Sequence, residues 1–487
     1  MLRLPQTKSG YALVGSAMLF VLSLAIPALL PSGGAPVLAG PAAAKPDPAL
    51  VEKGSYVARL GDCMACHTAV GGATYAGGLK IKTPVGAIYS TNITPTATGI
   101  GDYSLADFDA AVRRGIRKDG SSLYPAMPYS AFSRMSDEDI KALYAYFMYG
   151  VEPVAQANKA VDIRWPFSMR WPLALWRKWF ALEDGPFAAA PGQDPVVARG
   201  EYLVTGAGHC GACHTPRGWS MQEKAFDAKG GEVYLSGGAP IDNWVAPSLR
   251  NDPTVGLGNW SEEDIVQFLK SGRTDHAAVF GGMSDVVGWS TQHFKDEDLV
   301  AMARYLKSLP PVTAKGHYAY DPATAQMLAA GAVGSNAGAG IYLKECAICH
   351  SNDGSGVARM FPPLAGNPVI VTENPTSIVN VVVNGGVLPP TNWAPSAVAM
   401  PGFKDRLTDK QIADVVNFLR ISWGNKAPAN VTAKQVMKLR TAGEPVATTA
   451  WGAGTHQTST WGVFHPQPYG EGWTFAPETH DGREKAR

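Results

Sequence analysis

The 487-residue chain has few charged side chains and no excess of either sign. Only 17% of its residues are charged, and 42 basic residues stand against 41 acidic ones, so the formal net charge is +1. This balance provides no bulk attraction to nucleic acid or acidic lipid, and the low charge argues against a disordered chain. The 53 glycines and 37 prolines favour several small, loop-rich units, and three domains are expected.

Long apolar runs are absent except at the N-terminus. Two basic residues precede an apolar run from Tyr11 to Leu30, and small residues near Ala39 form a plausible cleavage point. Residues 1–39 are therefore predicted to be an export signal. The run is also long enough to anchor the chain uncleaved, but Pro27 and Pro31 favour cleavage.

No cysteine is left over for a disulfide, because all six fall in three copies of one pattern. The copies are Cys63, Cys66 and His67; Cys210, Cys213 and His214; and Cys346, Cys349 and His350. C-x-x-C-H is the attachment signature of c-type haem, in which both thiols form thioethers and the histidine binds the iron. A zinc site or a thioredoxin-like dithiol is the alternative for an isolated C-x-x-C. Three copies in an exported chain favour three haems c.

A repeat surrounds the three motifs. A Gly-x-Tyr step precedes each cysteine pair, and an amphipathic stretch ending in glycine follows it; two of these stretches open with capping boxes. A last helix then begins near Ser136, Asp296 or Thr408. The first and last helices of each unit are expected to cross where a glycine meets an aromatic residue. The expected pairs are Gly54 with Tyr146, Gly200 with Tyr305, and Gly340 with Phe418.

Histidine is missing where a second iron ligand is needed. None occurs between His67 and His209 or between His350 and His456, which excludes a local bis-His site in the first and third units. Methionine is then the expected distal ligand, and the candidates at matching positions are Met127, Met283 and Met400. His276 and His293 flank Met283 and remain alternatives to it, and His209 adjoins the second motif. His/Met ligation fills both axial positions, which argues against substrate chemistry at the iron.

The predicted fold is all-α, with three tandem cytochrome c domains and loop-rich linkers. The expected divisions are a signal at 1–39, domain 1 at 40–155, a Trp/Arg-rich linker at 156–190, domain 2 at 191–312, a linker at 313–330, domain 3 at 331–424 and a tail at 425–487.

Two segments outside these domains are candidate partner surfaces. Residues 163–182 interleave four tryptophans with four basic residues, which suits a membrane interface or a docking face; a linker packed on its own chain is the alternative. The tail from 425 to 487 carries six aromatic residues from Trp451 to Phe475. It is interpreted as a strap across either a partner subunit or its own chain.

Several motifs in this sequence resemble those of the tri-haem cytochrome c subunits of membrane-bound dehydrogenases that oxidise alcohols, gluconate, fructose or sorbitol. They are Thr83-Pro-Val-Gly-Ala-Ile-Tyr-Ser-Thr-Asn-Ile-Thr-Pro95, Tyr124-Pro-Ala-Met-Pro-Tyr129, Cys213-His-Thr-Pro-Arg217, Met283-Ser-Asp-Val-Val287 and Met400-Pro-Gly-Phe403. The resemblance covers about residues 48–424.

The resemblance implies an electron-transfer subunit at the periplasmic face of the inner membrane. It implies partners too: a catalytic subunit carrying a flavin or pyrroloquinoline quinone, a small subunit, and ubiquinone as acceptor. The chain itself would not act on the organic substrate and would contact the membrane peripherally. The alternatives from the residues are a stand-alone multi-haem enzyme of the peroxidase type and a soluble electron carrier.

Overall fold

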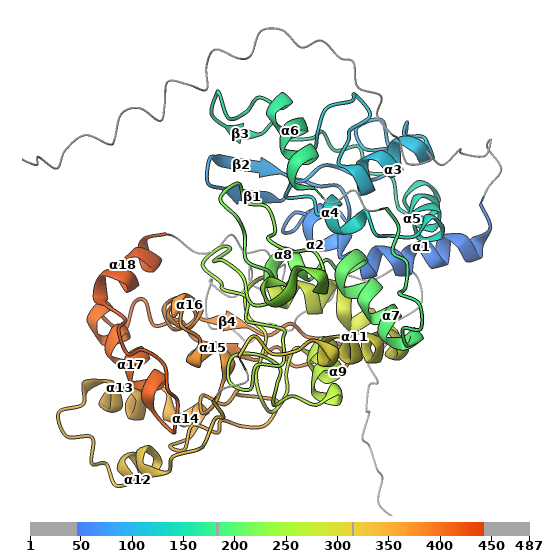
Figure 1. Cartoon of the computed structure of the whole chain (residues 1–487). Coiled ribbons are helices and arrows are strands. Elements are labelled where there is room, and N and C mark those ends of the chain that lie inside the picture. Colours follow the sequence, from blue (N-terminus) through green and yellow to red (C-terminus); the bar gives the residue numbers. More distant parts are fainter. Residues whose placement is uncertain (1–45, 182–184, 314–315, 443–487) are drawn as a thin grey trace, which may run out of the picture.

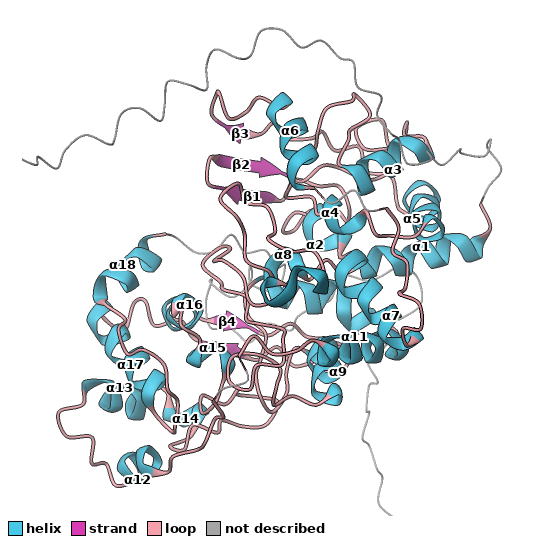
Figure 2. Ribbon diagram, viewed as in Figure 1, coloured by secondary structure: helices cyan, strands magenta, loops and turns pink. Residues whose placement is uncertain are grey.

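The computed structural model describes residues 46–181, 185–313 and 316–442, which we call units 1, 2 and 3 (Figure 1). The export signal predicted at 1–39 and the aromatic residues of the tail lie outside the described residues. The chain is mostly helical, with two small sheets (Figure 2). The expectation of an all-α fold is therefore not confirmed.

Unit 1 has six helices, one of which is formed by the first cysteine motif, and a three-stranded sheet. Its elements are α1 (Pro48–Leu60), α2 (Cys63–His67), β1 (Lys80–Thr83), β2 (Gly86–Tyr89), α3 (Leu105–Arg114), α4 (Tyr129–Phe132), α5 (Asp137–Tyr149), β3 (Asp162–Ile163) and α6 (Trp171–Phe180). Gly86, the first residue of β2, has a φ of +141°, and a Cβ atom there would lie 2.1 Å from the Asp162 carbonyl oxygen of β3, so glycine is required. The segment predicted as a linker supplies both β3 and α6.

Unit 2 repeats the helical part of unit 1. Its elements are α7 (Pro195–Tyr202), the π-helix η1 (Leu203–Ala207), α8 (Gly211–His214), the 3-10 segment η2 (Ala228–Val233), α9 (Glu262–Ser271), α10 (Gly282–Asp285), the π-helix η3 (Val286–Ser290), the 3-10 turn η4 (Thr291–His293) and α11 (Asp296–Ser308). The capping boxes predicted at Ser104 and Ser261 are present at the starts of α3 and α9.

Unit 3 has the same core helices and an added C-terminal helix. Its elements are α12 (Ala323–Ala329), α13 (Ala337–Glu345), α14 (Ala347–His350), α15 (Pro368–Val371), α16 (Thr376–Asn384), β4 (Gly386–Val387), β5 (Ala399–Met400), α17 (Asp409–Ile421) and α18 (Ala433–Thr441). Helix α18 lies in the predicted tail and packs on α16 and α17 through the buried side chain of Val436. This part of the tail therefore packs on its own chain.

We call the helix that leads into the cysteine motif the first helix of a unit, and the helix that starts near Ser136, Asp296 or Thr408 its last helix; α6, α12 and α18 lie outside these pairs. The first and last helices cross in every unit, as α1 with α5, α7 with α11, and α13 with α17. A Cβ atom on Gly54 would lie 1.9 Å from the Ala142 carbonyl oxygen, and one on Gly200 would lie 1.9 Å from the Ala301 oxygen. In unit 3 the close approach is made by Gly338, whose Cβ would lie 2.4 Å from the Asp414 oxygen. The prediction of Gly340 at this crossing is wrong, because that position faces open space.

The three units do not each have a hydrophobic core of their own. Buried residues of units 1 and 2 form one continuous cluster that includes Val57 and Leu299, whereas unit 3 has its own cluster around Val416. A small third cluster joins Val279 and Val287 of unit 2 to Leu388 of unit 3. Units 1 and 2 therefore share a core. Across residues 46–181, 185–313 and 316–442, no helix is both long enough and apolar enough to cross a bilayer.

Candidate haem sites

Each cysteine motif forms a short helix directly after the first helix of its unit. A residue with left-handed backbone stands immediately before the first two motifs, Asp62 with φ +49° and His209 with φ +38°. In unit 3, α13 runs on to Glu345, so the third motif is reached without such a break. All six cysteines are free thiols. The local backbone thus presents both thiols and the following histidine from one turn in each unit.

The three motif histidines make the same backbone contact. Nδ1 lies 2.7 Å from the Thr91 oxygen in His67, 2.8 Å from the Pro247 oxygen in His214, and 3.0 Å from the Pro362 oxygen in His350. A carbonyl oxygen only accepts, so Nδ1 carries the proton and Nε2 keeps its lone pair. Burial lowers the pKa of all three imidazoles, and the hydrogen bond to the carbonyl opposes that shift. The neutral form that binds iron is favoured.

The three predicted distal methionines occupy corresponding places, between the glycine-terminated helix and the last helix. Met127 precedes α4 and packs on the core shared by units 1 and 2. Met283 lies in α10 against both that core and the cluster between units 2 and 3. Met400 lies in β5 against the core of unit 3. Among the methionines set aside from the sequence, Met135 and Met302 are core side chains, as expected.

The histidines that compete with Met283 have partners of their own. His276 Nε2 lies 3.3 Å from Asp264 Oδ2, and its ring stacks on Trp260. His209 Nδ1 lies 2.9 Å from the Ala207 oxygen. Burial, with a smaller effect of Arg59, lowers the pKa of His293 to about 4, and a hydrogen bond with the backbone of Gly288 opposes that shift. The contacts of His276 and His209 support a bonding role for these rings rather than an axial one.

The donor set of each unit fits haem c. Two free thiols stand one turn apart, the imidazole after them has Nε2 available, and a thioether is held in the segment before the last helix. The supporting carbonyls of Thr91, Pro247 and Pro362 were not predicted from the sequence. Every residue carries a carbonyl, so residue type gives no signal for this role. The two π-helices that adjoin the second site, η1 and η3, were not predicted either.

Comparison with known proteins agrees with this donor set. A cytochrome c family model matches residues 51–149, 197–310 and 335–423, one match in each unit. The chain is 68% identical over 456 residues to the cytochrome c subunit of alcohol dehydrogenase (quinone) from Gluconacetobacter polyoxogenes, covering 93% of this chain and 97% of that one. It is 60% identical over 443 residues to the corresponding subunit from Gluconobacter oxydans (strain 621H), covering 91% and 92%.

A relative from another dehydrogenase is similar over most of its length as well. The gluconate 2-dehydrogenase cytochrome c subunit of Pantoea cypripedii is 56% identical over 396 residues, covering 80% of this chain and 90% of that one. The resemblance inferred from the motifs is confirmed. Cytochrome c domains with haem c as the cofactor are what the repeat encodes. The chain belongs to the cytochrome c family, among the cytochrome c subunits of quinone-dependent dehydrogenases.

Proposed function

We propose that this chain is a tri-haem electron relay that takes electrons from a catalytic dehydrogenase subunit and delivers them to ubiquinone at the periplasmic face of the membrane. One haem is held in each of the domains 40–155, 191–312 and 331–424. The axial pairs are His67 with Met127, His214 with Met283, and His350 with Met400. Haem c supplies a one-electron carrier when it is bound.

The observation that carries this proposal is that all three motif histidines are oriented by the same kind of hydrogen bond. In each unit a backbone carbonyl holds Nδ1 at 2.7 to 3.0 Å. A structural C-x-x-C site would need the thiols but not this orientation of the neighbouring imidazole. Each unit is therefore built to hold a metal at Nε2 of its histidine.

The arrangement of the units supports a relay in series. Unit 2, drawn in green and yellow, lies against α1, α2 and α4 of unit 1 through η1, η3 and η4 (Figure 1). Hydrogen bonds of Tyr202 in α7 and Asp298 in α11 add to this contact. It contacts unit 3 through the cluster formed by Val279, Val287 and Leu388. Electrons can thus pass from one end of the chain to the other through unit 2. The relatives are named as cytochrome c subunits of alcohol dehydrogenase (quinone) and of gluconate 2-dehydrogenase, which supports a catalytic dehydrogenase subunit as the partner.

Haem content and distal ligation test the proposal. Pyridine haemochrome and intact mass should give three covalent haems in the mature protein. Met127→Ala, Met283→Ala and Met400→Ala should each remove one third of the weak methionine-to-iron absorption band, whereas Met135→Leu, in the core, should leave it unchanged. Two haems or fewer would contradict the proposal. If His276→Ala altered this band and Met283→Ala did not, the second distal ligand would be wrong.

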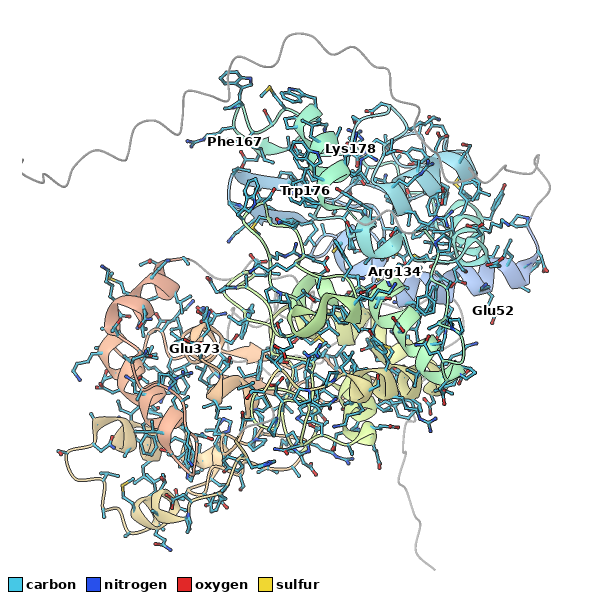
Figure 3. The ribbon with its side chains drawn as sticks, viewed as in Figure 1. Glu52, Arg134, Phe167, Trp176, Lys178 and Glu373 are labelled. Atoms are coloured by element: carbon cyan, nitrogen blue, oxygen red, sulfur yellow. The ribbon has the colours of Figure 1, made fainter. Side chains whose placement is uncertain are left out.

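Membrane contact is assigned to an exposed aromatic patch on unit 1 and the neighbouring loop of unit 2. The patch consists of Trp165, Phe167, Trp171, Trp179 and Trp219, exposed at 79%, 63%, 62%, 68% and 89%. Trp176 is different: its Nε1 donates to the Ser220 oxygen at 2.8 Å, which attaches α6 to unit 2. Figure 3 labels Phe167, Trp176 and Lys178 in this part of the molecule. Exposed rings beside basic side chains suit the interface of a bilayer.

The patch is tested by replacing Trp165, Trp171 and Trp179 with Ser. Each large ring contributes on the order of 1 to 3 kcal/mol to partitioning, so the complex should leave the membrane fraction and lose ubiquinone reduction. Trp393→Ser, at an exposed tryptophan of unit 3, is the control. If the triple variant stayed on the membrane but lost the catalytic subunit, the patch would be a docking face instead.

A further inference from the structure

Two tyrosines cross the boundary between units 1 and 2 in a reciprocal manner. The Tyr56 hydroxyl of α1 donates to Asp298 Oδ2 of α11 at 2.6 Å. The Tyr202 hydroxyl of α7 donates to Asp139 Oδ2 of α5 at 2.5 Å. The two tyrosines hold the same position in the repeat, two residues after the crossing glycines Gly54 and Gly200, and each aspartate is the third residue of its last helix.

Each tyrosine hydroxyl also accepts a hydrogen bond at the N-terminus of the other unit's last helix. The Tyr56 oxygen accepts the backbone N–H of Lys295, the residue before α11, at 3.0 Å. The Tyr202 oxygen accepts the backbone N–H of Ser136, the residue before α5, at 3.3 Å. Each phenol therefore bonds a free N–H at a helix start and an acidic side chain in its first turn. This is the self-complementary pattern of a two-fold interface, built here from two repeats of one chain.

The negative charge of each aspartate is paired with a basic side chain of its own unit. Lys53 Nζ lies 2.9 Å from Asp139 Oδ1, and Arg199 Nε lies 2.7 Å from Asp298 Oδ1. Lys53 and Arg199 are again equivalent, each one residue before a crossing glycine. Lys53 and Asp139 of one set and Tyr56, Arg199 and Asp298 of the other line one cavity of about 350 Å³, so the two sets of bonds are neighbours.

Unit 3 lacks every member of this set. Counting from its crossing glycine, Gly338, the equivalents of Lys53 and Tyr56 are Ala337 and Gly340. The residue before Ile412, which corresponds to Asp139, is Gln411. The same fold is thus present three times, but only two copies carry the side chains for the reciprocal contact.

We propose that Tyr56 and Tyr202 are positioning residues that lock units 1 and 2 into one rigid two-haem module, to which unit 3 is attached without such a lock. This inference rests on the proposed relay function, because fixed positions of the first two haems matter only if electrons pass between them. One electron then moves from the reduced to the oxidised centre with no bond made or broken. The tyrosines do not touch the reacting atoms; they fix the distance over which the electron moves.

The test compares Tyr56→Phe, Tyr202→Phe and the double variant of the full holoprotein by hydrogen–deuterium exchange. Tyr56→Phe should speed exchange in the first turn of α11 about tenfold, although the altered residue is in unit 1, because a hydrogen bond to a charged group is lost there. Tyr202→Phe should act in the same way on the first turn of α5. Tyr318→Phe, which removes a phenol bond to the Trp423 oxygen within unit 3, is the matched control. It should leave both turns unchanged.

The second measurement is the rate of electron equilibration between units 1 and 2 after photochemical reduction. It should fall at least severalfold in the double variant and stay unchanged in Tyr318→Phe. Exchange effects confined to the mutated unit, or an unchanged equilibration rate, would overturn the inference. A failure of the relay function itself would appear separately, as fewer than three haems in the wild-type protein.

Discussion

The two joints in this chain are built in different ways, although they connect copies of one fold. Units 1 and 2 meet where η1, η3 and η4 of unit 2 lie against α1, α2 and α4 of unit 1. They share a hydrophobic core and exchange charged hydrogen bonds, among them a buried pair of Arg134 and Asp227 at 2.6 Å. Units 2 and 3 meet through loops beside the distal methionines. Trp244 and Phe280 of unit 2 stack on each other and pack on the core of unit 3, and backbone groups of Val245 bond Ser377 of unit 3.

The difference indicates that a tandem repeat does not imply equivalent domains. A shared core couples the unfolding of units 1 and 2, because neither can lose its helices without exposing apolar surface of the other. Unit 3 has a separate cluster of buried residues, so we expect it to unfold by itself. We therefore expect two cooperative units rather than three, and the following predictions test that expectation.

The largest effect is expected at the crossing glycines. Gly54→Ala places a methyl group against the Ala142 carbonyl and should cost about 3 kcal/mol or more, with faster hydrogen–deuterium exchange across units 1 and 2 together. Gly338→Ala should produce a comparable loss confined to unit 3. The control is Gly340→Ala, which meets open space and should be neutral or stabilising by up to about 1 kcal/mol. Loss in unit 1 alone after Gly54→Ala would refute the coupling.

A smaller loss is expected when the buried ion pair between units 1 and 2 is broken. Asp227→Asn keeps an acceptor for the Lys229 N–H but leaves Arg134 without its carboxylate, at a cost of about 2 to 3 kcal/mol. Asp414→Asn removes the carboxylate of the exposed Lys410 pair and should cost about 0.5 kcal/mol or less. Denaturant unfolding followed by haem absorption measures both. Equal costs would show that the joint gains nothing from burying this pair.

The joint between units 2 and 3 should respond more weakly. Phe280→Leu keeps an apolar side chain over Gly386 of unit 3 but removes the ring that packs on the core of unit 3 and stacks on Trp244 of its own unit, so we expect a loss of about 1 kcal/mol. Electron equilibration between units 2 and 3 should slow, whereas that between units 1 and 2 should not change. Slowing of both steps would mean that unit 3 belongs to the same rigid body.

The smallest effect is a dependence on pH. Burial by itself would raise the pKa of Asp298, but hydrogen bonds from Arg199 and Tyr56 hold it below the ordinary value. A carboxylate with a lowered pKa stabilises the fold above the pKa of the unfolded chain, and this stability is lost as the pH falls through the folded pKa. Acid titration should therefore weaken units 1 and 2 below about pH 4, the ordinary range of an aspartate. Asp298→Asn should flatten this part of the profile, and an unchanged profile would exclude Asp298 as its cause.

The sequence by itself determined the chemistry of the sites and most of the helices. Cys-x-x-Cys-His is a local pattern, because thiols and imidazole must come from one turn, and residue spacing alone reveals it. The last helices start near the predicted residues Ser136, Asp296 and Thr408. Ser136 and Thr408 are N-caps whose side chains accept a backbone hydrogen bond, and such capping signals are local as well. Helix α18 escaped prediction, because its mostly polar sequence is held by packing on α16 and α17.

Tertiary structure alone decided how the copies are combined. The motif histidines are oriented by backbone carbonyls, which cannot be predicted from residue type. The crossing glycine of unit 3 is Gly338, and only the packed helices show that the two backbones approach there. Tyr56 and Asp298 are 242 residues apart, and their pairing depends on how two helices of different units meet. Local patterns fix local geometry, whereas contacts between distant segments depend on the whole packed arrangement.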